Sequence, residues 1–469
     1  MTDPYETATS LAGRLRRGEV SAQHATEASL ARIAALDGQL NAFLTVDAEG
    51  ARARARDLDR QRAEGAPCGP LHGVPVAIKD VTATAGLRTT QGSTLFADHV
   101  PAADALSVAR LRRAGAVIVG KTNTPEFAFG AVCTNRLCGP TRNPWDLSRT
   151  SGGSSGGSAV AVATGMVPLA QGTDFGGSVR MPASFCGLFG LRPAPGTIAE
   201  PERALGWSRL STQGVLARSA ADAALMLGAM AGPDPRDPLS GPPPDLGTLD
   251  TPPPAPLRLA ASLDLGRAFP VDAEVARAFD LAVARIEAAV GPVARAAPPV
   301  HGAAEAFKTL RAAESWYRSG AMVEAHEDAL TPSFVWNVRQ GRGLSAADML
   351  EADAVRTRVW RDFMAFFAAH EVLVMPACAI LPFPNAQEEV MEVGGRRLGS
   401  IIDYLACTFL ISLVGFPALA IPAPRAAGML PFGLQLVVAP GREALLLDLA
   451  TRLEEQGFAF APPPLPSPL

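Results

Sequence analysis

Two turns rich in glycine and serine lie close together in the chain and constrain its fold more than any other feature. They occupy residues 152–158 and 176–178 within the stretch 149–192. The small apolar residues 159–163 follow the first turn at once, so we expect a buried helix there and not a flexible linker. Glycine has no Cβ, so a substrate can approach the backbone N–H groups of such turns closely. Serine hydroxyls beside free N–H groups are what an acyl-transfer enzyme needs for its nucleophile and oxyanion hole.

Two other interpretations of the first turn have to be weighed. A phosphate-binding P-loop would end in Gly-Lys-Ser/Thr, which this turn lacks. Residues 152–156 also match the G-x-S-x-G pattern of the α/β-hydrolase nucleophile elbow, although the pattern is short and the chain has 44 glycines. An esterase of that kind would pair Ser154 or Ser155 with a later histidine, for which the chain offers His301, His326 and His370.

Charge, cysteine content and hydropathy argue against several classes of function. The 469 residues carry a net charge of −4 without a basic block, so the chain lacks the pattern of a nucleic-acid-binding protein. The six cysteines form neither a Cys-x-x-Cys pair nor a disulfide framework, and no secretory signal is evident, which predicts reduced thiols, a cytoplasmic location and no metal site. The stretch 404–424 is apolar, but Gly-Phe-Pro at 415–417 interrupts it, so we expect no membrane span.

Lysine is rare in this chain, which makes each lysine informative. The chain has only Lys79, Lys121 and Lys308, so arginine supplies 39 of the 42 basic residues. A buried lysine can become a neutral amine near pH 7, whereas arginine keeps its proton. Lys79 ends a short apolar strand, and strand alternation points Lys79 and Asp80 to opposite faces. The competing interpretation is a lysine that snorkels to solvent from a strand end, and it applies more plainly to Lys121.

The order of apolar segments indicates an α/β protein. The pattern predicts helices at residues 7–17, 21–36, 46–64, 105–114, 272–289, 303–325, 346–370 and 443–456. It predicts strands at residues 74–78, 117–119, 257–263, 372–375, 418–421 and 431–438. Strands that alternate with helices are typical of layered α/β folds. The proline-rich stretch 232–257 marks a surface connection.

Several motifs, taken together, resemble the amidase signature family of serine hydrolases. The main ones are residues 73–79, 152–158 and 172–180, with 75 residues from Lys79 to Ser154 and 24 from Ser154 to Ser178. Shorter matches are residues 121–123, 143–146, 185–187, 415–418 and 432–435.

The resemblance covers nearly the whole chain and implies the amidase signature fold, in which helices flank both faces of a large mixed β-sheet. It implies a single domain, 1–469, with N-terminal helices (1–66), a signature core (70–232), a proline-rich surface connection (233–256) and a second half that completes the sheet and the substrate pocket (257–469).

The resemblance also implies roles for individual residues. Ser178 looks like the nucleophile, Lys79 like a general base that starts neutral, and Ser154, after a cis peptide bond, like the relay between them. Backbone N–H groups would form the oxyanion hole at Phe175, Gly176, Gly177 and Ser178. The supporting residues would be Ser155, Asp174 and Arg180. This chemistry needs no metal and no organic cofactor.

Substrate and partners are where alternatives stay open. Large side chains in or near the motifs indicate an aryl or apolar amide: Phe127, Phe129, Phe175, Met181, Trp207, Trp316, Tyr317 and Trp336. We expect a stand-alone amidase that acts on a small linear amide and binds neither nucleic acid nor membrane. The resemblance also implies that a homodimer is one option for its oligomeric state. The alternative in the same family is the A subunit of a glutamyl-tRNA amidotransferase, from which the chain departs at Phe175 and at Met181. The esterase remains a further alternative.

Overall fold

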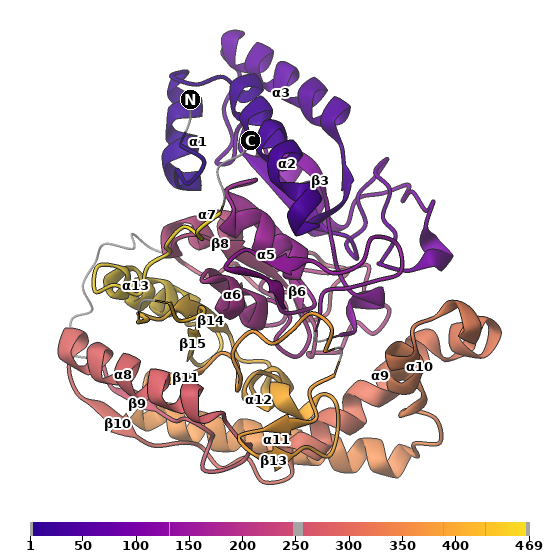
Figure 1. Cartoon of the computed structure of the whole chain (residues 1–469), viewed down its shortest axis with the longest axis vertical. Helices are drawn as coiled ribbons and strands as arrows, with labels where there is room; N and C mark the ends of the chain where they lie inside the picture. The colour runs from indigo at the N-terminus through magenta and orange to yellow at the C-terminus, as the bar shows by residue number, and fades with distance from the viewer. Residues whose placement is uncertain (1–2, 131, 247–256, 388, 427, 466–469) are drawn as a thin grey trace.

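An eleven-stranded sheet runs through the centre of the molecule (Figure 1). The computed structural model describes residues 3–130, 132–246, 257–387, 389–426 and 428–465. The strands, in spatial order, are β1 (Phe43–Val46), β3 (Val117–Thr122), β2 (Pro75–Lys79), β6 (Leu169–Asp174), β8 (Thr212–Ala217), β7 (Phe189–Arg192), β14 (Ala418–Pro422), β15 (Gly433–Val437), β11 (Val372–Pro376), β9 (Leu259–Ala261) and β10 (Val293–Arg295). The β3–β2, β2–β6, β11–β9 and β9–β10 pairs are parallel and the other pairs antiparallel, so the sheet is mixed.

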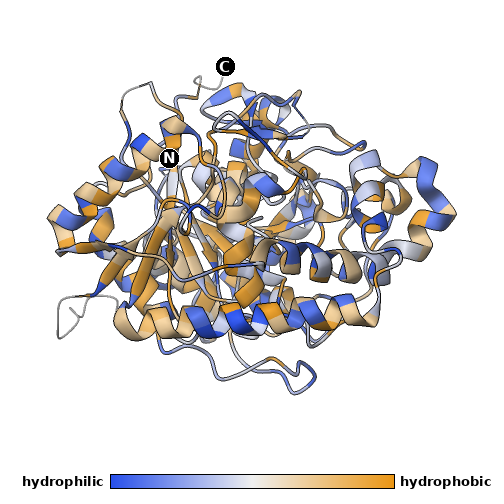
Figure 2. Ribbon diagram, turned by 90° about the horizontal axis from the view of Figure 1, so that it is seen from below, coloured by the Kyte–Doolittle hydropathy of each residue, from blue (hydrophilic) through white to orange (hydrophobic). Residues whose placement is uncertain are grey.

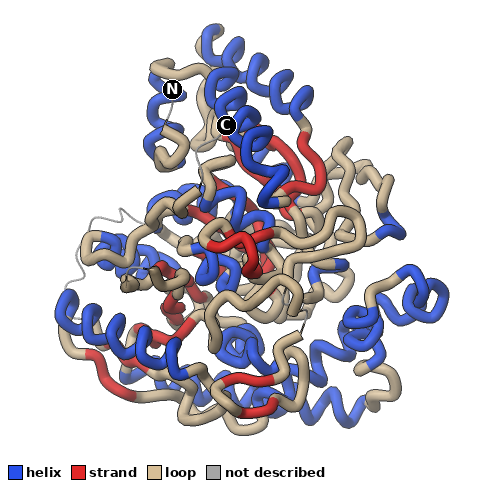
Figure 3. The backbone as a smooth tube through the Cα atoms, in the orientation of Figure 1, coloured by secondary structure: helices blue, strands red, loops and turns tan. Residues whose placement is uncertain are grey.

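Helices lie on either side of the sheet (Figure 3). In the described ranges they are α1 (Ala8–Arg17), α2 (Ala22–Leu40), α3 (Ala48–Ala63), α4 (Leu106–Arg113), α5 (Gly156–Ala163), α6 (Arg180–Cys186), α7 (Ala220–Met230), α8 (Ala273–Val290), α9 (Ala303–His326), α10 (Pro332–Arg339), α11 (Ala346–Ala369), α12 (Ala406–Val414) and α13 (Glu443–Glu454). Short hairpins are formed by β4 (Arg142–Asn143) with β5 (Asp146–Thr150) and by β12 (Glu392–Val393) with β13 (Arg396–Arg397). The predicted α/β layering is confirmed.

The hydropathy of the elements explains this arrangement. The central strands are mainly hydrophobic, whereas the long outer helices alternate hydrophobic and hydrophilic residues (Figure 2). Strands such as β2 and β6 have helices on both sides and are buried along nearly their whole length; their first residues are apolar, and their polar residues lie toward the carboxyl ends. Side chains at the expected helix starts cap the first turns of α1, α2 and α11, namely Thr7, Ser21 and Ser345.

The apolar stretch 404–424 is divided between two short elements. Helix α12 ends at Gly415, whose φ of 70° is left-handed, and the chain then enters β14. Across the described ranges, none of the helices has the length and apolar character needed to cross a membrane. Of the proline-rich connection predicted at 233–256, the structure describes residues 233–246, and residues 247–256 lie outside the described ranges.

The second half of the chain brings α9 and α12 together in a separate apolar cluster. Phe307 of α9 stacks on Phe409 of α12, with ring centroids 4.5 Å apart, and both are buried. Phe175, directly after β6, packs edge-on against Phe307. The chain after residue 300 therefore reaches the turn that contains Ser178.

Candidate active site

Lys79 and Ser154 meet at the carboxyl ends of two parallel strands. Lys79 ends β2, and Thr173 lies near the end of the neighbouring strand β6. The Lys79 Nζ lies 2.7 Å from the Ser154 Oγ and 2.9 Å from the Thr173 Oγ1. Ser154 enters from the turn that precedes α5, and the Gly153–Ser154 peptide bond is cis. The parallel pairing thus places one amine against two hydroxyls inside the protein.

The environment of Lys79 favours its neutral form. Its side chain is completely buried, so the interpretation of a snorkelling lysine is wrong. The two hydroxyls give the amine partners inside the protein, and it has no need to reach solvent. Burial lowers the pKa of Lys79 to about 7, although Cys133 and Asp174 act in the opposite direction. A substantial fraction of the molecules therefore carries a free lone pair on Lys79 at neutral pH.

Ser178 lies on the turn between β6 and α6, beside the first Gly/Ser turn. The Ser155 N–H donates to the Ser178 carbonyl oxygen at 3.0 Å, so the two turns are in direct contact. Ser154 and Ser155 are buried, whereas Ser178 is partly exposed. Its hydroxyl forms no hydrogen bond with another described residue. Of the three serines, Ser178 is the one that a substrate can reach.

A buried carboxylate shapes the Ser178 turn. Asp174 accepts hydrogen bonds from the N–H groups of Gly177, at 2.8 Å, and Val179, at 3.2 Å. The Arg180 guanidinium donates to both oxygens of Asp174, at 2.9 and 3.0 Å. Burial disfavours the charged form of Asp174, but Arg180 and Arg192 outweigh it and hold the pKa of that carboxyl well below its usual range. Asp174 is therefore a permanent anion that fixes the turn.

These contacts change the predicted set of oxyanion donors. The Gly177 N–H is already bound to Asp174, so Gly177 does not belong among the free donors, and Phe175, Gly176 and Ser178 remain. Gly177 has a φ of +127°, and a Cβ at this position would lie 2.2 Å from the Thr408 Oγ1. Glycine is needed at position 177 for conformation and close approach and not for its donor.

Residues from the second half that the sequence analysis missed hold this turn. The Thr408 Oγ1 of α12 donates to the Gly176 carbonyl at 2.7 Å. Arg180 donates to the Thr408 carbonyl at 3.0 Å, to the Gln435 side chain at 3.0 Å and to the Ser412 Oγ at 2.7 Å. Thr408 and Ser412 are polar residues four apart in an otherwise apolar helix, a signal available in the sequence.

Lys121 is the second lysine at the end of a central strand, and it is also completely buried. It donates hydrogen bonds to the Thr84 Oγ1, at 3.0 Å, to the Thr89 Oγ1, at 2.9 Å, and to the Thr82 carbonyl. Burial lowers the pKa of Lys121 to about 7, although the negative charge of Asp80 acts in the opposite direction. The interpretation of a snorkelling lysine is therefore wrong here as well, because the loop after β2 folds acceptors over the amine.

The aromatic and methionine candidates for the pocket divide into two groups. Met181 is buried, and the half-buried ones are Phe127, Phe129, Phe175, Trp316 and Trp336. Trp207 and Tyr317 are 76% and 68% exposed, so their placement does not support a role as pocket lining. Residue size was visible in the sequence, but the direction in which each side chain points was not.

The histidines give no support to the esterase alternative. His301 and His326 are exposed, and the ring of His370 packs on Phe366. The partner at the Ser154 hydroxyl is Lys79, and no histidine of the described ranges hydrogen-bonds to Ser154 or Ser155.

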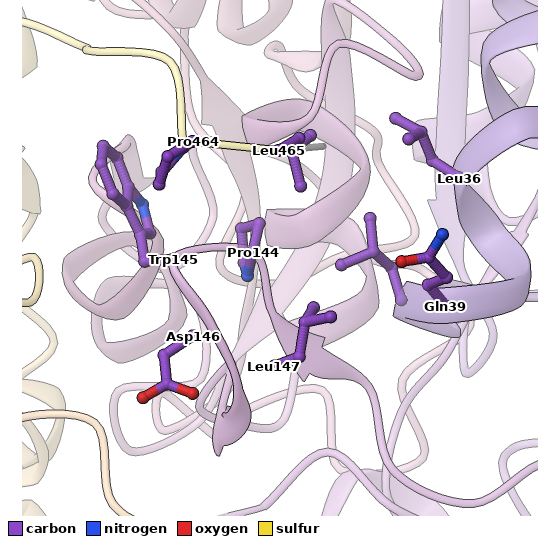
Figure 4. Close-up of a pocket in the computed structure, with 9 residues that line it drawn as sticks. Leu36, Gln39, Pro144, Trp145, Asp146, Leu147, Pro464 and Leu465 are labelled. Carbon is purple, nitrogen blue, oxygen red and sulfur yellow. The ribbon is translucent and has the colours of Figure 1, made fainter. Parts of the chain in front are cut away.

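Two cavities lie outside this site. One, of about 160 Å³, is bordered by the end of α2, by the β4–β5 hairpin around Trp145 and by Pro464 and Leu465 (Figure 4). The other, of about 310 Å³, shares Trp145 and Pro464 and includes Arg425, whose guanidinium lies 3.7 Å from the centre of the Trp145 ring. Neither is lined by Lys79, Ser154 or Ser178.

The fold and the site define an α/β enzyme in which a buried lysine and two Gly/Ser turns meet at the carboxyl ends of inner strands of a mixed sheet. The model of the amidase family matches residues 24–447, and the chain belongs to this family of amide hydrolases. It is 37% identical to the A subunit of the glutamyl-tRNA(Gln) amidotransferase of Moorella thermoacetica and 35% identical to an acylamidase of Rhodococcus erythropolis; the matches cover 96% of this chain and 96% and 94% of those proteins. The structure of a bacterial aryl acylamidase of the amidase signature family superposes with a TM-score of 0.90 at 25% identity, covering 96% of both chains. The predicted family and amidase signature fold are thereby confirmed.

Proposed function

We propose that the protein hydrolyses amides through an acyl-enzyme on Ser178. The observation that carries this proposal is the 2.7 Å contact between the buried Lys79 amine and the Ser154 hydroxyl, next to the partly exposed Ser178. Neutral Lys79 accepts the Ser154 proton while Ser154 accepts the Ser178 proton, and the Ser178 oxygen attacks the amide carbon. The same path returns the proton to the departing amine. Water then cleaves the ester and restores Ser178.

The turn that contains Ser178 supplies the charge stabilisation. The N–H groups of Phe175, Gly176 and Ser178 are the candidate donors to the oxyanion of the tetrahedral intermediate. A donor of this kind contributes about 3 kcal/mol in comparable sites. Asp174 and Arg180 hold the turn rigid, so the donors need no reorganisation when the charge develops.

The surroundings of the turn favour a substrate with an apolar or aromatic portion. Phe175 leads into the turn, and Phe307 and Phe409 pack beside it. Apolar and aromatic side chains beside a reacting centre favour the binding of an aryl ring or an alkyl chain. The similarity to an acylamidase and to an aryl acylamidase agrees with this substrate class.

A second candidate is hydrolysis of glutamine within an amidotransferase built from several subunits. Sequence similarity supports this candidate better than the first, because A subunits of glutamyl-tRNA(Gln) amidotransferases are 37% and 38% identical over almost the whole chain, against 35% for the acylamidase. Against it, the residue that leads into the Ser178 turn is the half-buried, apolar Phe175.

Release of amine by the purified chain alone separates the two candidates. The panel contains aryl anilides, aliphatic primary amides, peptide amides and glutamine, with Ser178→Ala as the inactive control. We expect turnover of anilides or apolar amides without partners. Activity on glutamine alone, or only after tRNA and partner subunits are added, would favour the amidotransferase role.

A further inference from the structure

Arg311 of α9 is a buried arginine without a hydrogen-bonding partner. Its side chain is 7% exposed, and its Nε and Nη1 are both buried and unpaired. None of its guanidinium nitrogens donates to a described residue; the guanidinium lies over the ring of Phe129, 5.8 Å from the ring centre. A buried cation is costly unless an anion or several acceptors compensate it. This arginine therefore lacks the partner that its position requires.

The charges around Arg311 do not supply that partner. Burial lowers the pKa of Arg311 to about 10. Among the described carboxylates, the negative charge of Asp403 opposes this shift. Arg311 thus keeps its charge at neutral pH. Asp403 is itself paired with the Lys308 Nζ at 2.8 Å, and Lys308 also contacts the exposed Glu305 at 2.9 Å. Glu314, on the next turn of α9, bonds to Ser208 instead. Asp403 is therefore shared between Lys308 and Arg311, and none of the described carboxylates hydrogen-bonds to Arg311.

Arg311 lies on the same face of α9 as Phe307, a residue in contact with the Ser178 turn. The Phe307 Cζ is 3.3 Å from where a Cβ on Gly176 would lie. Residues four apart share a helix face, and four residues span about 6 Å of helix. Helix α9 also packs on α12, which carries Thr408 (Figure 1). Arg311 therefore lies one helical turn from the residue that packs against the Ser178 turn.

We propose that Arg311 binds a carboxylate at the far end of the substrate, so that the preferred substrates are amides whose acyl part carries a carboxylate a few carbons from the scissile carbonyl. The proposal rests on the proposed amidase function and deepens it. A guanidinium donates several charge-assisted hydrogen bonds to a carboxylate, and the nitrogens of Arg311 have no hydrogen-bond acceptor among the described residues. The apolar walls would contact the methylene groups in between.

The test compares three 4-nitroanilides with the same leaving group, followed by the release of 4-nitroaniline. The succinic and glutaric acid monoanilides carry the carboxylate, and the butyric acid anilide is the neutral control. For the wild-type protein, we expect kcat/KM at least about tenfold higher for one of the acids than for the neutral anilide. In Arg311→Met, this preference should disappear while turnover of the neutral anilide stays within about twofold. A wild-type preference that survives in Arg311→Met, or an equal loss on all three substrates, would overturn the proposal.

Two further variants exclude a purely structural explanation. Arg311→Lys keeps the charge and should retain part of the preference. Arg295→Met removes an exposed arginine that lies over Phe279 in the same geometry, at 5.7 Å, and should leave the preference unchanged. Because Arg311 is a buried charge without a hydrogen-bond acceptor among the described residues, Arg311→Met should also melt at or above the wild-type Tm.

If no anilide is turned over, a binding measurement with glutarate still tests the role of Arg311. Calorimetry of glutarate with Ser178→Ala should show binding that weakens at least tenfold when Arg311→Met is added. Equal binding with and without Arg311 would overturn the carboxylate site. If Ser178→Ala retains turnover, the proposed nucleophile fails, and the glutarate measurement still decides the role of Arg311.

Discussion

Two lysines on neighbouring parallel strands share the same burial but have different partners. Lys79 ends β2 and Lys121 lies near the end of β3, and burial lowers the pKa of each to about 7. Lys79 contacts the hydroxyls of Ser154 and Thr173. Lys121 contacts a backbone carbonyl, that of Thr82, as well as two threonine hydroxyls. A perturbed pKa alone does not tell these two sites apart.

The difference lies in what the partners can donate. A hydroxyl can donate its proton to a neutral amine, whereas a carbonyl oxygen only accepts. Lys79 can therefore act as a base toward Ser154, while the carbonyl of Thr82 requires Lys121 to donate. Lys79 also lies beside a turn that solvent reaches at Ser178, whereas the partners of Lys121 all come from the loop after β2. We therefore propose a chemical role for Lys79 and a structural role for Lys121.

The largest expected effect comes from removing the Lys79 amine. Lys79→Met should lower kcat/KM by about 10³-fold or more, because no other described group is placed to accept the Ser154 proton. Its Tm should equal or exceed that of the wild type, since a buried amine is replaced by an apolar chain of similar length. Anilide turnover and thermal unfolding measure the two effects. An active Lys79→Met protein would remove Lys79 from the mechanism.

The matching change at the second lysine should affect stability instead. Lys121→Met removes one donor to the Thr82 carbonyl and the positive charge that acts on the buried Asp80, and it should cost about 3 kcal/mol of unfolding free energy. Turnover by the folded protein should stay within about threefold of wild type. Urea unfolding measures the loss, and Lys308→Met, at a more exposed lysine, is the control with about 1 kcal/mol or less. Loss of turnover in a fully folded Lys121→Met protein would contradict the comparison.

The pH dependence sharpens the comparison further. With a Lys79 pKa of about 7, kcat/KM should rise about tenfold from pH 6 to pH 8 as the amine loses its proton. The midpoint should be the same in Lys121→Met. In the unfolded chain both lysines have a pKa near 10.5, so between pH 7 and 10 the unfolded chain binds more protons than the folded protein. The free energy of unfolding should therefore rise with pH in this range. A flat activity profile from pH 6 to 8 would be incompatible with Lys79 as the base.

The smallest effect concerns the support of the Ser178 turn from α12. Thr408→Val removes the hydrogen bond to the Gly176 carbonyl and should lower kcat about fivefold, close to 1 kcal/mol. Thr408→Ser, which keeps the hydroxyl, should remain near wild type. Single-turnover rates with an anilide separate this effect from changes in substrate binding. Equal rates for the Val and Ser variants would show that the α12 contact plays no part.

Local signals in the sequence were sufficient for most of the fold. Apolar runs bounded by glycine and proline predicted the positions of β2, β3, β11 and β14, and the periodicity of apolar residues predicted most of the long helices. The order and spacing of the Gly/Ser motifs identified the family. The proximity of Lys79 and Ser154 followed from the family resemblance and agrees with the structure, but the roles assigned to the site residues stay predictions.

The misses concern contacts between distant segments. The burial of Lys121 depends on a loop that folds back over it, and the contact of Thr408 with Gly176 joins residues more than 200 positions apart. Strand periodicity does not record either contact. The exposure of Trp207 and Tyr317 depends on which way a loop and a helix face, and a single sequence does not contain that information either. The hydrogen bond from the Gly177 N–H to Asp174 could not be foreseen either, because a motif does not show which donors are already bound.

The long-range contacts of Arg180 also bear on how the enzyme is made. Its partners Ser412 and Gln435 are synthesised more than 230 residues after it. At roughly 5–20 residues per second, a ribosome needs on the order of 10 to 50 seconds to reach them. During that time the nascent chain contains its lysine and both serines, but the turn that carries Ser178 lacks its anchors. The protein should therefore become a hydrolase only after residue 435 has been synthesised, so Ser178 would stay unreactive in a nascent chain that ends before that residue.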